Sequence, residues 1–243
     1  MKSLKMAASI IGAACTISSG GASAQSGGVL LPITITNASG NVADMGFAAD
    51  GNPNTIWNSG GLPSQWINID LGSERMISKM RLLPAQSPAS AGVSHIVWAY
   101  RSDGSKYRLL ALERTITQDN QWIDLYNNLE TTVRYLTVET TRSPSWVAWR
   151  ELQIFDGGTL ESTCDFNVNR NGWALISTSL YGGCGIGNYR YFYRDVRNLP
   201  SGAGVQSCVT IDGVPGLIKK EFRQNIGKCD GFLQDGYYYY EQQ

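Results

Sequence analysis

The chain has 243 residues, and its 20 basic side chains are balanced by 20 acidic ones. This balance argues against nucleic acid as a partner, because nucleic-acid binding needs a concentrated basic face. It also argues against a polybasic patch for an anionic membrane surface.

The first 24 residues have the pattern of a signal peptide. Two lysines precede a short apolar run, Met6–Ile17, and Ala22-Ser23-Ala24 provides a small-residue cleavage site. The apolar run is shorter than the ~20 residues that cross a bilayer, and no later segment is long and apolar enough. We therefore expect a secreted chain, extracellular or periplasmic, that begins at Gln25 and has no transmembrane segment.

Residues 25–156 contain no cysteine and predict one all-β domain. Short runs with apolar alternation or β-branched residues recur between turn signals such as Asp50-Gly51 and Asp103-Gly104. The runs are 33–36, 66–71, 77–83, 96–100, 107–112, 122–125, 133–140 and 149–155. This many short strands in one domain is typical of a β-sandwich or jelly roll.

Two segments of this domain carry the most specific signal. Residues 50–57 read Asp-Gly-Asn-Pro-Asn-Thr-Ile-Trp, an oxygen-rich turn closed by a tryptophan. Residues 65–72 read Gln-Trp-Ile-Asn-Ile-Asp-Leu-Gly, a period-two strand. Together they resemble the opening of the discoidin, or coagulation factor 5/8 type C, domain family, which includes galactose-binding-like carbohydrate-binding modules of bacteria. The resemblance covers residues 29–156 and implies a discoidin-like jelly-roll β-sandwich that binds rather than catalyses.

The turn at residues 50–55 is also a candidate calcium site. It offers a carboxylate, amide oxygens, a hydroxyl and backbone carbonyls, and Ca²⁺ takes 6–8 oxygen ligands. The alternative is a turn held only by its own hydrogen bonds. In the family that the sequence resembles, such a turn often holds calcium with a glutamate near the end of the domain. The resemblance thus implies a structural calcium ion held by Asp50, Asn52, Thr55 and Glu151.

The resemblance also implies a ligand site in the loops at one end of the sandwich. These loops correspond to residues 44–47, 58–64, 84–94 and 142–146. Galactose-binding members commonly carry Trp-His, Pro-Arg and Asn-Gly pairs in them. The matching pairs in this chain are Trp57-Asn58, Pro84-Ala85 and Ala91-Gly92. The resemblance therefore carries the fold and leaves the identity of the sugar open.

Four residues near these loops are the candidate ligand contacts. Asn58 stands where the family has histidine, and His95 is the only histidine in the chain. A strand-edge residue with a satisfied ring is the alternative for His95. Arg142 and Trp146 offer a guanidinium and an indole, which could hold a sugar, a carboxylate or a peptide. We expect the other two tryptophans of the motif, Trp57 and Trp66, in the core.

The last third of the chain predicts a separate, small, β-rich domain. Residues 157–163 are the expected linker, and residues 164–243 hold Cys164, Cys184, Cys208 and Cys229. An even number of cysteines in an exported chain predicts two disulfide bonds, whose pairing has three possibilities. A unit this small buries little core and depends on such bonds. No family is recognised for it.

These observations predict a secreted, non-catalytic, lectin-like protein whose partner is an extracellular glycan or glycoprotein. Catalysis is disfavoured because one histidine is available and no nucleophile motif accompanies it. Two alternatives stay open. One is a protein-binding component, such as an adhesin, toxin or surface-complex subunit, that uses the C-terminal domain. The other is a small hydrolase with paired carboxylates in that domain.

Overall fold

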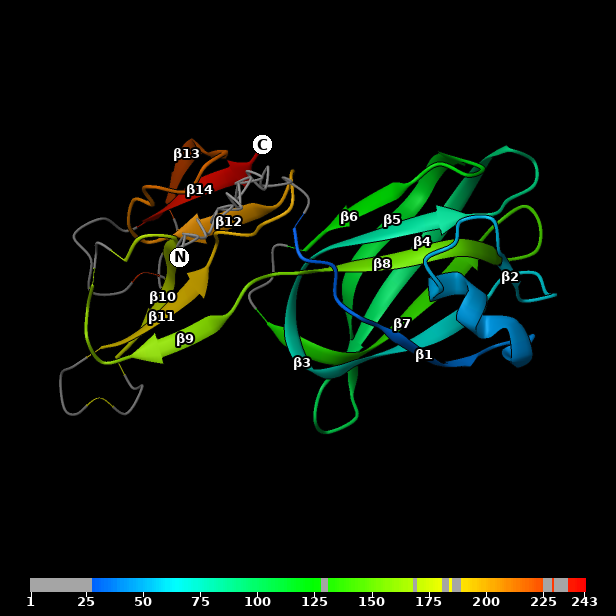
Figure 1. Cartoon of the computed structure of the whole chain (residues 1–243), viewed down its shortest axis with the longest axis horizontal. Coiled ribbons are helices and arrows are strands. Elements are labelled where there is room, and N and C mark those ends of the chain that lie inside the picture. The colour runs from blue at the N-terminus through cyan, green and yellow to red at the C-terminus, as the bar shows by residue number, and fades with distance from the viewer. Residues whose placement is uncertain are drawn as a thin grey trace, which may run out of the picture.

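The chain folds into two all-β units that lie side by side (Figure 1). The computed structural model describes residues 28–127, 131–167, 170–180, 184, 189–224, 229 and 236–243. The expected signal peptide, residues 1–24, lies outside these residues. Within them, no helix is long and apolar enough to cross a membrane.

The N-terminal unit is a sandwich of two antiparallel layers. The first layer has the order β1-β3-β7-β4-β5, and the second has the order β2-β8-β3-β6. The 3-10 helix η1 (Val42–Ala49) follows β1 and packs against it, β2 and β8. The strands are β1 (Thr34–Ala38), β2 (Trp57–Asn58), β3 (Gln65–Pro84), β4 (Ser90–Tyr100), β5 (Lys106–Gln118), β6 (Ile123–Tyr126), β7 (Thr132–Arg142) and β8 (Ala148–Asp156). The predicted jelly-roll sandwich is confirmed.

Strand β3 belongs to both layers. The sequence predicted two strands here, at 66–71 and 77–83, but the structure has one strand of 20 residues. Its first part pairs with β1 and β7, and its second part pairs with β6 and β8. The pairing with β7 changes register between Asp70 and Arg75, where Gly72 adopts a φ of 77°. Glycine takes this left-handed conformation without steric cost, so the strand can turn there from one layer into the other.

The core lies between the two layers and follows the period of the strands. In β3, Ile67 and Ile69 are buried while their neighbours point to the outer face. Trp57 is fully buried, as predicted, and its Nε1 donates a hydrogen bond to the Gly40 carbonyl (3.0 Å). The prediction for Trp66 was wrong, because this side chain precedes the inward Ile67 and is only half-buried on the outer face.

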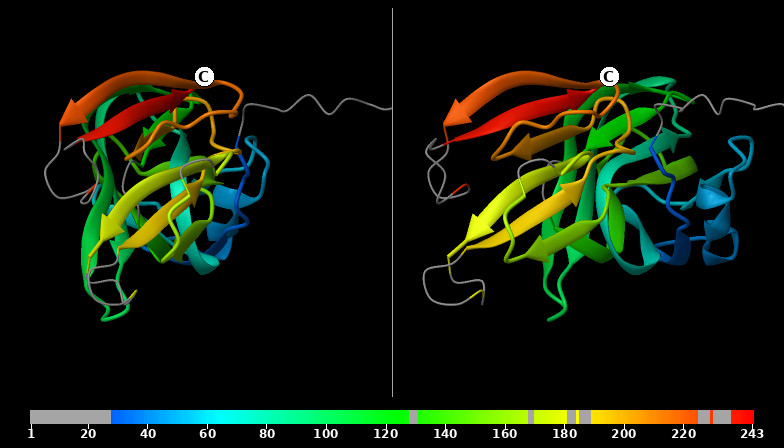
Figure 2. Two further views of the ribbon diagram at one scale, coloured as in Figure 1. Left: turned by 90° about the vertical axis from the view of Figure 1, so that its left-hand side faces the viewer. Right: turned by 60° about the vertical axis from the view of Figure 1, so that its left-hand side comes forward.

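In the C-terminal unit, the described residues form two three-stranded sheets. One has the order β10-β11-β9 and the other β12-β14-β13 (Figure 2, yellow and orange to red). Two disulfides decide the pairing that the sequence left open, Cys164–Cys184 and Cys208–Cys229. The strands are β9 (Leu160–Thr163), β10 (Trp173–Ser179), β11 (Arg190–Asp195), β12 (Gly204–Ser207), β13 (Leu217–Gln224) and β14 (Gly236–Gln242).

The junction between the units is shorter than the expected linker of residues 157–163. Residues 160–163 form β9 and pair with β11, so the C-terminal unit begins before Cys164. The buried side chain of Arg194 donates from Nε to the Gly157 carbonyl (2.7 Å). A Cβ atom at Gly158 would lie 2.0 Å from the Asp195 carbonyl oxygen, so only glycine permits this approach.

The burial of Trp57 makes a prediction for stability. Trp57→Ala removes a fully buried indole and should lower the free energy of unfolding by about 3–5 kcal/mol. Trp146→Ala is the matched control, because Trp146 is 45% exposed, and should cost about 0.5 kcal/mol or less. Urea unfolding followed by far-UV circular dichroism measures both, and equal losses would contradict the assigned core.

Candidate functional site

The oxygen-rich turn at residues 50–55 folds around the Asp50 carboxylate. Oδ1 of Asp50 accepts from the Asn52 N–H (2.8 Å), and Oδ2 accepts from the Thr55 hydroxyl (2.8 Å). Oδ1 of Asn52 accepts from the Asn54 N–H (3.1 Å). The turn is therefore held by its own hydrogen bonds.

Glu151 joins this turn from strand β8, 100 residues further along the chain. Its Oε2 accepts from the Gly51 N–H (3.1 Å), and the residue is only 4% exposed. Burial, together with the nearby Asp50 carboxylate, raises the pKa of the Glu151 carboxyl to about 7, although the Gly51 N–H works in the opposite direction.

The turn offers carboxylate, amide, hydroxyl and backbone carbonyl oxygens, and oxygens are the ligands of hard cations such as Ca²⁺. Within the described residues, no three His, Cys, Asp or Glu side chains converge on one point. The acidic pair of Asp50 and Glu151 would thus hold a cation only together with neutral oxygens, such as the Thr55 hydroxyl, which lies 2.8 Å from Oδ2 of Asp50.

A small recess opens between the loops at one end of the sandwich. It brings together two of the four predicted ligand residues, His95 from β4 and Trp146 from the β7–β8 loop. Its volume is about 10 Å³, roughly the space of one water oxygen. We call it the loop-end recess; its lining also includes Pro84, Ala85, Gln86, Thr140, Ser143 and Trp149.

His95 forms the buried wall of the loop-end recess. Only 3% of the residue is exposed, and its Nδ1 lies 3.0 Å from the Thr140 hydroxyl. Burial lowers the pKa of the imidazole to about 3, so the ring is neutral at pH 7. Among the described residues, neither His95 Nε2 nor the Nε1 of the neighbouring Trp149 ring has a hydrogen-bond partner.

This arrangement can accept a hydroxyl group. A buried polar atom without a partner costs about 1–3 kcal/mol, so an oxygen that reaches these ring nitrogens is favoured. The indole N–H of Trp149 can only donate, while a neutral imidazole offers one donor and one acceptor. Trp146, which is 45% exposed, adds an apolar ring face to the lining of the recess.

The other two predicted ligand residues do not line the loop-end recess. The Asn58 side chain forms a hydrogen bond within its own loop, in which its Oδ1 accepts from the Gly60 N–H (2.9 Å). The Asn58 backbone carbonyl also accepts from the Asn41 side chain. Arg142 is exposed at the end of β7, opposite Ser94 on β4.

Thr140 and Trp149 are the recess residues that the sequence analysis missed. Strand alternation could have indicated Thr140, since it follows the buried Leu136 and Val138 at period two. Trp149 lies in a predicted strand. The sequence could not show that its Nε1 has no hydrogen-bond partner among the described residues, because this depends on how the loops pack over the ring.

A family model described as the F5/8 type C domain matches residues 33–152. These residues belong to the F5/8 type C domain family. No curated protein matches the chain.

Among solved structures, similarity extends over about half of this chain. A family 32 carbohydrate-binding module from Clostridium perfringens NanJ in complex with galactose is 16% identical, with a TM-score of 0.43; the match covers 52% of this chain and 98% of that one. A module of the same organism's CpGH89, in complex with GalNAc-β-1,3-galactose, is 21% identical, with a TM-score of 0.43 and coverage of 52% and 99%. A C. perfringens family 89 glycoside hydrolase is 18% identical, with a TM-score of 0.45. That match covers 53% of this chain but only 15% of the hydrolase chain.

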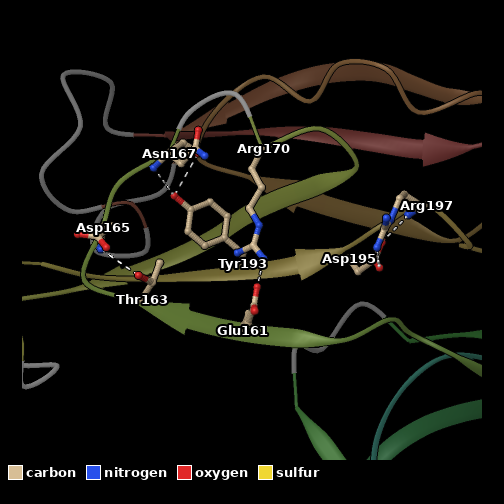
Figure 3. Close-up of polar contacts among 8 residues, drawn as sticks. All are labelled: Glu161, Thr163, Asp165, Asn167, Arg170, Tyr193, Asp195 and Arg197. Carbon is tan, nitrogen blue, oxygen red and sulfur yellow. Dashed lines mark hydrogen bonds and ion pairs between the residues drawn. The ribbon is translucent and has the colours of Figure 1, made fainter.

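The C-terminal unit, outside the F5/8 type C domain, carries a second polar cluster (Figure 3). Arg170 pairs with Glu161 and lies over the Trp173 ring (3.8 Å to its centroid). Asp195 binds Arg197 through both carboxylate oxygens (2.9 and 2.5 Å). Burial raises the pKa of the Asp195 carboxyl, but its bonds to Arg197 outweigh this and lower the pKa overall.

This pairing bears on the hydrolase alternative. A glycosidase acid needs a carboxyl group with a raised pKa. Asp195 has the opposite shift, and Glu221 is paired with Arg223. Asp230 and Asp235, two further carboxylates of the C-terminal unit, lie outside the described residues.

Neutral His95 makes a prediction for pH dependence. Its folded pKa lies below the unfolded value of 6.5, so the unfolded chain binds the extra proton and stability falls as pH drops below 6.5. Between pH 7.5 and pH 5 this should cost about 2 kcal/mol, a cost that His95→Asn should remove. Urea unfolding of both proteins at both pH values measures the difference.

Glu151 titrates in the same range with the opposite sign, but it does so in both proteins, so the comparison isolates His95. An identical pH dependence of the two proteins would show that the imidazole is not held neutral by burial.

Proposed function

We propose that the F5/8 type C domain is a secreted, non-catalytic glycan-binding module that holds its sugar at the loop-end recess. The observation that carries this proposal is the exposed Trp146 beside two buried ring nitrogens, those of His95 and Trp149, for which the described part of the chain provides no hydrogen-bond partner. A pyranose presents both an apolar ring face and hydroxyl groups, so one sugar can meet both features.

The chemistry of the recess favours a neutral sugar hydroxyl over a charged group. His95 is neutral, and the recess lining contains no lysine, arginine, aspartate or glutamate. The recess is too small for a whole ring, so one hydroxyl would enter it while the ring lies against Trp146.

Export is supported by the two disulfides, because such bonds form and persist in oxidising compartments. The expected signal peptide, residues 1–24, agrees with this proposal.

We further propose that Asp50, Asn52, Thr55 and Glu151 hold a structural calcium ion. The hydrogen bond from Gly51 to Glu151 supports this, because it brings the buried Glu151 carboxyl near the Asp50 carboxylate, which also accepts a hydrogen bond from the Thr55 hydroxyl. A bound cation would neutralise the repulsion between Asp50 and Glu151 and fix the turn to β8.

The glycan proposal predicts saturable sugar binding that depends on Trp146. On a glycan array, the full chain should bind a specific neutral glycan, and Trp146→Ala should weaken that binding about tenfold through loss of the stacking surface. Phe166→Ala is a matched control, since Phe166 is similarly exposed (43%) but lies in the C-terminal unit.

Two results would count against the glycan proposal. Binding that survives Trp146→Ala would move the site away from the recess. No binding by a folded chain would favour the alternative of a protein partner at the C-terminal unit.

The calcium proposal predicts stabilisation by Ca²⁺ that depends on Glu151. Calcium at about 100 times its Kd should stabilise the native chain by about 2.7 kcal/mol relative to a chelator. Glu151→Gln should remove most of this effect, whereas Glu113→Gln, at a carboxylate of 59% exposure, should not. Thermal unfolding in calcium and in chelator measures it, and equal stabilisation of all three proteins would refute the site.

A further inference from the structure

A groove of about 490 Å³ lies on the outer face of the first layer, away from the loop-end recess. Its volume is within the range of sites that bind small ligands. Residues from four adjacent strands and from the β4–β5 turn line it. We call it the sheet groove; its functional side chains are Thr36, Asn68, Glu74, Tyr100, Arg101 and Tyr135.

Strand alternation turns this set of side chains outward. In β7 the core residues Leu136 and Val138 alternate with Tyr135 and Thr137, and in β4 the core residue Ala99 precedes Tyr100. The strands that carry them lie next to one another in the first layer (Figure 1).

A relay of hydrogen bonds fixes which groups of the sheet groove donate and which accept. The Thr137 hydroxyl uses its only proton to donate a hydrogen bond to Oδ1 of Asn68 (2.7 Å). The Tyr100 hydroxyl, 2.9 Å from Thr137, must therefore donate to it. This leaves the lone pairs of the Tyr100 oxygen as acceptors and the Asn68 NH₂ as a donor, for which the described residues provide no partner.

The donor, on Asn68 of β3, and the acceptor, on Tyr100 of β4, lie on either side of the Thr137 hydroxyl on β7, the strand between them. A sugar hydroxyl is itself both a donor and an acceptor, so a run of hydroxyls matches such a pair. Tyr135, 46% exposed, adds a ring for stacking, and the Arg134 guanidinium, 4.8 Å from its centroid, holds it in place.

The charges of the sheet groove favour a neutral ligand. Its lining contains one carboxylate, Glu74, and one guanidinium, Arg101, so neither sign of ligand is preferred. Both groups can also bond to hydroxyls, the first as an acceptor and the second as a donor.

An extended peptide fits the sheet groove less well than a sugar chain does. Peptides that bind β-sheets usually add a strand at a free edge. The three strands beneath the groove, β3, β7 and β4, are each paired on both sides in the first layer. Recognition must therefore come from side chains alone.

We propose that the sheet groove is a second binding site, specific for a linear neutral oligosaccharide. It is independent of the loop-end recess, shares none of its lining residues and does not need the proposed function of that recess.

The test is calorimetric titration of the full chain, in the Trp146→Ala background, with neutral hexasaccharides: chitohexaose, cellohexaose, xylohexaose, mannohexaose and laminarihexaose. At least one should bind. Tyr135→Ala should weaken that binding about tenfold, while Tyr135→Phe keeps the ring and the affinity. Asn68→Asp removes the NH₂ donor but retains the acceptor for Thr137, and should weaken binding about fivefold.

Phe222→Ala is the matched control, because Phe222 is an exposed ring (44%) in the C-terminal unit and should leave the affinity unchanged. Circular dichroism confirms that each variant is folded. Hexasaccharide binding that Tyr135→Ala and Asn68→Asp leave intact would overturn the proposal, as would the absence of binding by every hexasaccharide. Neither result bears on the loop-end recess, which the glycan array tests separately.

Discussion

Strand β3 pairs with β1 and β7 in one layer and with β6 and β8 in the other, so a single backbone joins both layers of the sandwich. The constraint is local, since the register changes between Asp70 and Arg75 around the left-handed Gly72. Asp70 reinforces this point, because it accepts two hydrogen bonds from the Arg134 guanidinium and one from the Gly72 N–H. Bonds from Arg134 and Gly72 also lower the pKa of Asp70.

Both candidate sites depend on this arrangement. The end of β3 at Pro84 leads into the loop that lines the loop-end recess, while Asn68 near its start contributes to the sheet groove. The neighbours of β3 carry the rest: β4 contributes His95 to one site and Tyr100 to the other, and β7 contributes Thr140 and Tyr135. The inward and outward residues of the same strands therefore serve two different surfaces.

The sequence indicated every strand of the sandwich except β2, but it did not indicate how the strands connect. Period-two alternation indicated the strands of the sandwich, and the motif at 50–57 indicated the family. The sequence could not show that residues 66–71 and 77–83 belong to one strand. The residues at the register shift between them have the same sequence pattern as a turn. The sequence analysis also placed Trp66 in the core, although alternation with Ile67 puts it outside.

The details of the loop-end recess depend on tertiary packing in the same way. His95 was a candidate from its rarity and position, but its burial and its orphaned Nε2 follow from Trp149 and Thr140, which are distant in sequence. The disulfide pairing likewise needed the fold, since four cysteines at these spacings permit three connectivities.

Hydrogen–deuterium exchange of the full chain, with and without the best array glycan, tests whether a glycan binds at the loop end of the sandwich. A glycan bound there should slow exchange in residues 84–95 and 142–149, with no change in β9–β14. Slower exchange confined to β9–β14 would contradict binding at the loop end and assign it to the C-terminal unit.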